Sequence, residues 1–267
     1  MDKSQEWDSE IYHEVSTVQE KWGQDVIRRE KWIGNEVVMD AGCGTGRVTR
    51  ILAQKIREEG MVYAVDIDSN MVSHARKNLK DFKNVMVIQG DLVDIELPRK
   101  VDVIFSNAVI HWILDHKTLF KHFWDLLSST VNNDQRGKIL VQCGGYGNLT
   151  RVYEFIKQIK ESGEFKSHFV NWKERWYFAK LDDTEKLLEE IGFTNIDVYL
   201  SDAITTFPDS KAYSQFVKTV VMKPFLQYLP DDQLKDRYVK LFLDTVEKSG
   251  LSWSLDFVRL NIIAHIV

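Results

Sequence analysis

Three acidic residues follow apolar runs at nearly equal intervals. Asp40 follows Val37-Val38-Met39, Asp66 ends MVYAVD 26 residues later, and Asp91 lies 25 residues further on. That interval suits one strand-helix-strand crossover, so each acid is expected at the end of a buried strand. Parallel strands end at a shared sheet edge, where α/β folds bind ligands. Asp66 could accept hydrogen bonds from ribose hydroxyls and Asp91 from the amine of adenine, although an ordinary turn aspartate is the simpler alternative for Asp91. The spacing therefore predicts a nucleoside site.

A glycine-rich turn follows the first of these acids. In DAGCGTG, Gly42, Gly44 and Gly46 let a ligand approach bare backbone. The dinucleotide fingerprint G-x-G-x-x-G would place its third glycine where this chain has Arg47. The turn alone is also compatible with a tight β–α connection that binds nothing. The spacing disfavours an NAD(P)-dependent dehydrogenase.

Two further side chains that could take part in chemistry follow the predicted fourth strand, residues 101–107. His111 could be a general base, and a histidine that serves only the loop is the alternative. Trp112 could be a core residue, or its indole N–H could act as one directed donor. Loops at this sheet edge carry function more often than packing.

The periodicity of the chain supplies the elements that would position these residues. It predicts a helix over residues 11–34, then alternating strands and helices as far as residue 145. The even rhythm ends there, and residues 146–180 are rich in aromatics that could be core or could line an acceptor pocket. The later predictions are a helix over 182–192, a strand over 194–201, helices over 209–225 and 231–249, and a strand over 257–267. Without repeats or a linker-like run, we expect one domain of doubly wound α/β class over 1–267.

Composition narrows the functional classes. The chain has 267 residues, 44% of them hydrophobic, with a net charge of −5 and no Lys/Arg-rich run, which disfavours nucleic acid as a partner. Cys43 and Cys143 form neither a disulfide framework nor a metal-ligand cluster, so reduced thiols and no metal are expected. The polar first residues are no signal peptide, and no stretch approaches the ~20 apolar residues of a membrane span. A soluble cytoplasmic protein is the expectation.

With these elements placed, the chain resembles the class I S-adenosylmethionine (SAM) dependent methyltransferases over essentially its whole length. The motifs DAGCGTG, AVDID, GDL and FSNAVIHWILDH carry this resemblance. YHEVSTVQ, GFTNIDV and VVMKPFLQYLP are similar to the trans-aconitate and juvenile hormone acid methyltransferase group. The resemblance implies a mostly parallel seven-stranded sheet with an inserted helical cap. It divides the domain into amino-terminal helices (1–34), a SAM-binding half (35–145), cap segments (146–180 and 205–250) and the rest of the sheet (181–204 and 251–267).

The resemblance also implies residue roles. The methionine part of SAM would lie at Asp40 and the glycine turn, the nucleoside at the next two strand ends, and the methionine ammonium at Asn107. The implied cofactor residues are Asp40, Gly42, Cys43, Gly44, Gly46, Asp66, Ile67, Met71, Asp91, Leu92 and Asn107. Gln19 and Trp112 match positions that hold the substrate carboxylate in juvenile hormone acid relatives. The predicted acceptor-binding residues are Tyr146, Trp172, Trp176 and Lys223. Lys223 stands where trans-aconitate relatives carry arginine, which replaces a bidentate fork with a point charge.

These roles predict methyl transfer to the carboxylate of a small organic acid. A carboxylate with a pKa near ~4 is ionised at neutral pH and needs no general base. One alternative is an amine, carbon or hydroxyl acceptor with His111 as base, and another is a SAM-binding protein without catalysis. A DNA amino-methyltransferase is disfavoured, because Asn107-Ala108-Val109-Ile110 stands in place of N-P-P-Y. The sequence leaves the oligomeric state and the identity of the acid open.

Overall fold

The computed structural model describes residues 16–129, 137–250 and 253–266. The chain divides into two compact units. Unit 1 comprises Met1–Tyr146, Trp176–Ser201 and Arg259–Val267, and unit 2 comprises Gly147–Arg175 and Asp202–Val258. The predicted SAM-binding half falls in unit 1. The predicted cap segments fall in unit 2 except for residues 146 and 176–180, and the single domain over 1–267 stays a prediction.

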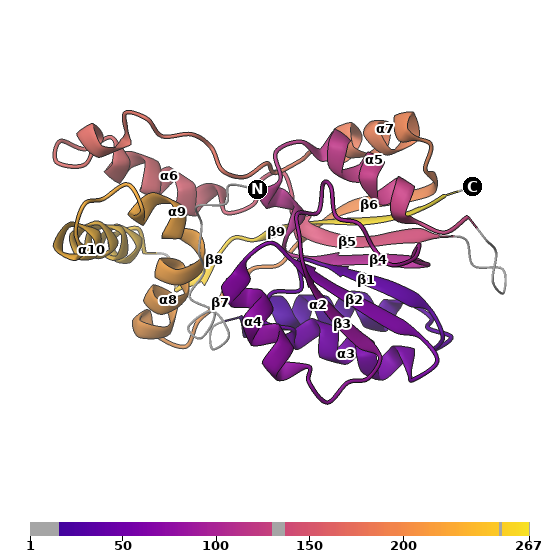
Figure 1. Cartoon of the computed structure of the whole chain (residues 1–267). Helices are drawn as coiled ribbons and strands as arrows, with labels where there is room; N and C mark the ends of the chain where they lie inside the picture. The colour runs from indigo at the N-terminus through magenta and orange to yellow at the C-terminus, as the bar shows by residue number, and fades with distance from the viewer. Residues whose placement is uncertain (1–15, 130–136, 251–252, 267) are drawn as a thin grey trace. The chain divides into compact units, whose positions relative to one another are not determined.

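Unit 1 is built on a seven-stranded sheet in the order β3-β2-β1-β4-β5-β9-β6 (Figure 1). Strands β1 to β5 pair in parallel and β9 runs antiparallel to β5. The bounds are β1 Val37–Ala41, β2 Met61–Asp66, β3 Val85–Gln89, β4 Val103–Asn107, β5 Lys138–Gly144, β6 Thr194–Asp202 and β9 Val258–His265. The predicted doubly wound, mostly parallel seven-stranded fold is confirmed.

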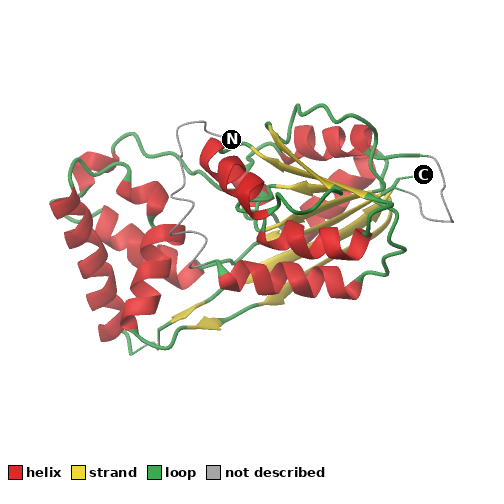
Figure 2. Ribbon diagram, turned by 60° about the horizontal axis from the view of Figure 1, so that its bottom comes forward, coloured by secondary structure: helices red, strands yellow, loops and turns green. Residues whose placement is uncertain are grey.

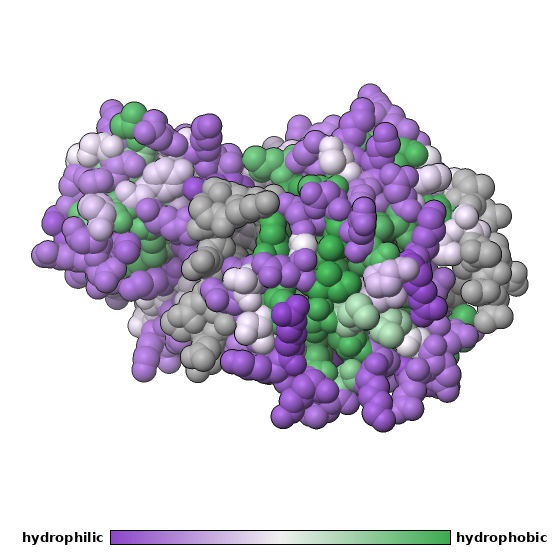
Figure 3. Space-filling model, in the orientation of Figure 1, coloured by the Kyte–Doolittle hydropathy of each residue, from purple (hydrophilic) through white to green (hydrophobic). Residues whose placement is uncertain are grey.

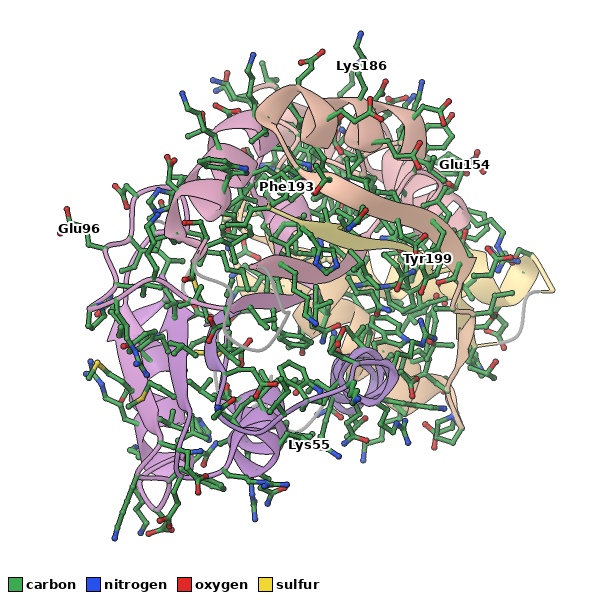
Figure 4. The ribbon with its side chains drawn as sticks, turned by 90° about the vertical axis from the view of Figure 1, so that its right-hand side faces the viewer. Lys55, Glu96, Glu154, Lys186, Phe193 and Tyr199 are labelled. Carbon is green, nitrogen blue, oxygen red and sulfur yellow. The ribbon has the colours of Figure 1, made fainter. Side chains whose placement is uncertain are left out.

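Helices cover both faces of this sheet (Figure 2). Helices α2 (Thr17–Arg29), α3 (Arg47–Ile56) and α4 (Ser69–Asn78) pack on one face, where Ile27, Leu52 and Ala75 are buried. Helices α5 (His116–Leu126) and α7 (Leu181–Ile191) bury Phe120 and Leu188 on the other face. In Figure 4, Lys55 on α3 and Lys186 on α7 accordingly lie on opposite sides of the sheet.

Local chemistry fixes where several of these helices begin and end. The Asp68 carboxylate accepts hydrogen bonds from the backbone N–H groups of Asn70 and Met71, which makes it the N-cap of α4; the sequence allows either Asp68 or Ser69 in this role. Asp115 caps α5 by accepting from Thr118. Gly192 ends α7 in the left-handed conformation, as predicted. These three residues therefore fix one end each of α4, α5 and α7.

Several predicted boundaries differ from the structure. Helix α2 ends at Arg29 rather than at residue 34, and the indole of Trp32 folds back to donate to the Ile27 carbonyl. Asp40 lies inside β1 rather than after it. Residues 11–15 of the predicted first helix and Val267 of the predicted last strand lie outside the described residues.

Unit 2 is helical and rich in buried aromatic side chains. It contains α6 (Thr150–Lys160), a 3₁₀-helix (Lys166–Phe169), α8 (Ser210–Phe216), a π-helix (Val217–Val221), α9 (Lys223–Leu226), α10 (Asp232–Lys248) and the two-stranded sheet of β7 (Thr205–Thr206) and β8 (Ser254–Leu255). Its fully buried aromatics are Phe165, Tyr213, Phe216, Tyr238 and Phe242. The helix predicted over 209–225 is interrupted because Pro224 has no backbone N–H, and the turn before it widens to a Met222 N–H bond with the Val217 carbonyl.

Surface hydropathy follows the layers of unit 1. On the face drawn in Figure 3, hydrophobic residues gather over its strands and hydrophilic residues cover most of its helices. At the sheet edge, Met86 of β3 is 45% exposed. Across the described parts of the chain, no helix is both long and apolar enough to cross a bilayer.

Candidate cofactor and acceptor site

Asp40 is a buried acid on the face of β1 that α3 covers. Its side chain is 2% exposed, and the hydroxyl of Thr49 donates to its Oδ2 at 2.6 Å. Burial raises the pKa of Asp40 to about 7, the bond from Thr49 opposes the rise, and the charge of Asp66 adds to it. The protein thus holds an acid that ionises near neutral pH next to the glycine turn.

Asp66 links the end of β2 to the glycine turn. The backbone N–H of Gly44 donates to its Oδ2 at 2.8 Å, and that of Asp68 donates to its Oδ1 at 3.0 Å. Burial raises the pKa of Asp66 to about 6, and the two backbone donors limit the rise. The carboxylate therefore fixes the turn and keeps lone pairs for further donors, since each oxygen can accept more than one bond.

The glycines of the turn differ in how much room a side chain would have at each position. All three have positive φ, the conformation that favours glycine. A Cβ at Gly42 would lie 2.3 Å from Cγ2 of Val109, so this glycine serves close packing. A Cβ at Gly44 would meet nothing within 4 Å. Gly44 therefore presents open backbone to a ligand, while its N–H anchors the turn on Asp66.

The residues predicted around adenine lie beyond β2 and β3. Asp66 pairs with Gln89 in the parallel register, and the N–H of Gly90 donates to the Asp66 carbonyl. Asp91 follows, half-buried, and accepts a long bond from the Val93 N–H at 3.4 Å. The apolar residues Met71 and Leu92 are buried and Ile67 is partly buried. The structure thus brings Asp40, Asp66 and Asp91 to one edge of three adjacent strands.

Asn107, at the end of β4, and Gln19, on α2, each have a buried side-chain amide oxygen. The side chain of Asn107 donates to the Gln19 carbonyl at 2.8 Å. No donor among the described residues reaches Asn107 Oδ1 or Gln19 Oε1, although both atoms are buried. The Arg47–Glu20 ion pair at 2.6 Å ties α2, and with it Gln19, to α3. Acceptors without donors suit an ammonium group, so they fit the predicted methionine ammonium.

His111 is a neutral histidine in the 3₁₀-helix Ile110–Trp112. The backbone N–H of Gly144 donates to its Nδ1 at 3.3 Å. Burial, with the charge of Arg259 and then that of His116, lowers the pKa of His111 well below its ordinary value. Because Nδ1 acts as an acceptor, the proton of the neutral ring resides on Nε2. His111 is thus built as a hydrogen-bond donor rather than as a base.

An aromatic wall surrounds His111 within unit 1. We define it as Trp112, Trp176 and Phe178. The Trp112 and Trp176 rings meet edge to face at 6.1 Å, and Phe178 lies 5.9 Å from the His111 ring. The N–H of Tyr177 donates to the His111 carbonyl, which joins the two segments. The wall places the indole of Trp112 beside His111 in apolar surroundings.

The predicted acceptor-binding residues divide between the units. Tyr146 and Trp176 belong to unit 1, where Tyr146 is 59% exposed with the ammonium of Lys180 over its ring. Trp172 and Lys223 belong to unit 2. The ring of Trp172 stacks on Phe225 at 4.4 Å, and the ammonium of Lys160 lies over the Trp172 ring at 5.2 Å. Lys223 begins α9 and is half-buried. The acceptor-binding roles of all four residues stay predictions.

Sequence reasoning missed Gln142, Asn261 and Arg259, three polar residues between the sheet and α2. We call Asn107, Gln142 and Asn261 the amide row, because each pairs with the next across β4, β5 and β9. Arg259, 3% exposed, lies on the same face of β9. The available signal was a single arginine in the apolar run FVRLNIIAHIV. The grouping of these residues was missed because residues 142 and 261 are far apart in the chain.

The raised pKa of Asp40 predicts a specific pH dependence of stability. Protonated Asp40 is favoured in the folded state, so its contribution is fully present below the unfolded pKa of 3.8 and is lost as the pH rises through about 7. Relative to Asp40→Asn, the wild type should therefore lose roughly 2–4 kcal/mol of unfolding free energy between pH 4 and 8. Urea unfolding of both proteins across this range measures the difference.

Asp115→Asn is the contrasting variant in that experiment. The bonds from Thr118 lower the pKa of Asp115, so its contribution is constant above the unfolded pKa of 3.8 and is lost only at lower pH, the opposite sign. Between pH 4 and 8 the difference between wild type and Asp115→Asn should therefore stay constant. A difference between wild type and Asp40→Asn that stays constant across the range would contradict the buried-acid description.

The chain is similar in sequence to several known methyltransferases. A family described as a methyltransferase domain matches residues 34–190. An uncharacterized methyltransferase of Schizosaccharomyces pombe is 26% identical over 97% of each chain. Juvenile hormone acid O-methyltransferase of Bombyx mori is 25% identical over 91% of this chain and 87% of its own. Trans-aconitate 2-methyltransferase of Escherichia coli is 22% identical over 85% of this chain and 84% of its own.

A solved structure shares the fold. Phosphoethanolamine N-methyltransferase 2 of Haemonchus contortus, in complex with S-adenosylhomocysteine, superposes with a TM-score of 0.61 at 17% identity, covering 97% of this chain and 56% of that one. The family match covers more than half of the chain. The chain therefore belongs to the methyltransferase domain family and is, as its motifs predicted, a class I SAM-dependent methyltransferase.

Proposed function

We propose that the protein transfers the methyl group of SAM to the carboxylate of a small organic acid, forming a methyl ester. The observation that carries this proposal is the state of His111, whose Nδ1 accepts from Gly144 and whose imidazole is neutral. His111 therefore offers a donor rather than a base to the acceptor, and a carboxylate is a nucleophile that needs no base. The similarity to juvenile hormone acid and trans-aconitate methyltransferases, at 25% and 22% identity, supports an acid acceptor.

The edge of strands β1 to β4 would hold the cofactor. Asp66 would accept from the ribose hydroxyls, Asp91 with Leu92, Met71 and Ile67 would bind adenine, and Asn107 would accept from the methionine ammonium. Asp40 and the turn of Gly42, Cys43, Gly44 and Gly46 would border the methionine part. The buried acceptors Asn107 Oδ1 and Gln19 Oε1 support this assignment, as does the S-adenosylhomocysteine bound by the fold relative. When bound, SAM supplies a methyl group on a positively charged sulfur.

The chain's own residues would orient the acceptor and keep water away. The Gln19 amide, the Trp112 indole N–H and the Nε2–H of His111 can each donate to one carboxylate oxygen. The other oxygen then keeps its lone pair for the methyl carbon, and the carbon–sulfur bond breaks as the carbon–oxygen bond forms. No proton is transferred. Because the reaction cancels two opposite charges, the apolar wall around His111 would favour it by excluding water.

A His111→Ala variant tests the absence of a general base. We expect it to keep SAM binding and to lose no more than about a hundredfold in kcat/KM toward an acid, the cost of one donor to a charged oxygen. Steady-state kinetics with calorimetric SAM titration measures both. A loss near ~10³-fold or more with intact SAM affinity would favour an amine, carbon or hydroxyl acceptor that needs His111 as base.

A further inference from the structure

Arg259 reaches the carboxyl edge of the sheet from its antiparallel strand. In the register of β5 and β9, Gly144 pairs with Arg259 and Gln142 pairs with Asn261. Because β9 runs against β5, the first residues of β9 lie where β5 ends. Arg259 is therefore beside the Gly144 backbone that donates to His111.

The side chain of Arg259 points to the face that α2 covers. Its guanidinium carbon lies 4.2 Å from the centre of the Trp22 ring. Trp22 is three residues after Gln19 on α2, so both lie on one helical face. Arg259 is thus positioned one helical turn from the amide proposed to hold the acceptor carboxylate, and the indole face fixes the plane of the guanidinium.

The amide oxygens around Arg259 would disfavour an anion, so the attraction must come from Arg259 itself. Within the amide row, Gln142 donates to Asn261 at 2.7 Å, and Asn261 donates to Ser201 at 3.0 Å and to the Arg259 carbonyl at 3.3 Å. The oxygens of Asn107 and Gln142 are buried, and no donor of the described residues reaches them. Those oxygens repel a carboxylate, whereas a guanidinium offers N–H donors in a planar fork that matches it.

Arg259 carries a buried positive charge near the carboxyl edge of the sheet. The side chain is 3% exposed, and a guanidinium stays protonated in proteins. Burial is the main cause of the lowered pKa of His111, and the positive charge of Arg259 lowers it further. A buried positive charge raises the affinity for an anion and opposes a cation at the same place.

The geometry points to Arg259 as the residue that makes the site specific for an anionic methyl acceptor, with Trp22 as the residue that positions it. This inference rests on the proposed function and names the group that selects its substrate class. The carboxylate is negative before transfer and neutral as an ester. Arg259 therefore holds the acid more strongly than the ester, so its removal should raise KM and should not lower kcat.

The test compares Arg259→Gln and Arg259→Lys with a matched control. Arg29→Gln is the control, because Arg29 lies on helix α2, which also carries Trp22, is exposed and donates to the Tyr199 hydroxyl. The probes are octanoate, 4-phenylbutanoate and adipate, each with its amide and its sulfonate analogue. Ester formation gives kcat and KM, and calorimetry gives SAM affinity and sulfonate binding in the presence of S-adenosylhomocysteine.

Arg259→Gln should raise the KM of the acids by about tenfold or more while kcat and SAM affinity change by less than about threefold. Arg259→Gln should also abolish sulfonate binding. The KM and sulfonate affinity of Arg259→Lys should fall between those of Arg259→Gln and the wild type. Arg29→Gln should match the wild type in both. An Arg259→Gln protein with unchanged KM for acids and unchanged sulfonate binding would overturn the inference. A parallel loss of SAM affinity, or a kcat that falls with KM unaltered, would also overturn it.

The sulfonates separate this inference from the proposed function. Sulfonates carry the charge but are poor nucleophiles, so their binding needs no ester chemistry. If the wild type forms no ester but binds sulfonates only when Arg259 is present, the proposed function fails and the anion site stands. If the wild type forms esters and Arg259→Gln behaves identically, the function stands and the anion site fails. If the wild type binds neither acids nor sulfonates, both fail.

Discussion

Asp66→Ala is expected to lose at least about a hundredfold in SAM affinity, the largest effect of any single substitution in the cofactor region. Two ribose hydroxyls bonded to a carboxylate contribute roughly 1.5–3 kcal/mol each in such a site. The same carboxylate accepts from the Gly44 N–H at 2.8 Å, so its removal also releases the glycine turn. Calorimetric titration of wild type and variant with SAM measures the loss.

Asp81→Ala is the matched control for that titration, because Asp81 is an exposed carboxylate of unit 1. It should bind SAM like the wild type. Thermal unfolding with and without SAM adds a second readout, since only a bound ligand raises the melting temperature. An Asp66→Ala protein that is folded and retains its SAM-dependent rise in melting temperature would disprove the ribose assignment.

Trp112→Phe is expected to lower kcat/KM toward a carboxylic acid by about ten- to a hundredfold and to leave SAM affinity nearly unchanged. The substitution removes the indole N–H and keeps an aromatic ring against Trp176 and His111. A donor to a charged oxygen contributes roughly 1.5–3 kcal/mol, which sets this range. Ester formation at saturating SAM, over a series of acid concentrations, gives the ratio.

Trp124→Phe provides the control for the loss of an indole. Trp124 is 37% exposed on α5, away from the aromatic wall, and its replacement should leave kcat/KM within about threefold. Equal losses in the two variants, or a Trp112→Phe protein as active as the wild type, would remove Trp112 from the acceptor site. A loss of SAM affinity in Trp112→Phe would place the indole in cofactor binding instead.

The periodic half of the fold could be predicted from the chain because its signals are local. Asp40, Asp66 and Asp91 recur at the spacing of a βα unit, and the sheet places them on adjacent strands β1, β2 and β3. Asp68 could be identified as a cap because its side chain reaches N–H groups two and three residues ahead. In each case the residue and its partner lie within one repeat, where spacing alone determines the geometry.

The rest depended on pairings between distant parts of the chain. Arg259 and Gly144 meet only because β9 inserts antiparallel beside β5, and nothing near either residue specifies that register. The donation from Gly144 to His111 likewise joins the end of β5 to the 3₁₀-helix Ile110–Trp112, so the sequence left two roles open for His111, a base or a histidine that serves only the loop. The helix predicted over 209–225 is interrupted before Pro224, which has no backbone N–H to continue it.

The identity of the atom that receives the methyl group is the most direct test of the account. The protein should be incubated with methyl-labelled SAM and a panel of carboxylic acids, and the product treated with mild base. Release of the label as methanol, dependent on enzyme and acid, is the predicted result because methyl esters hydrolyse under these conditions. Label that enters the product but resists base would place the methyl group on nitrogen, carbon or a hydroxyl oxygen and contradict the account.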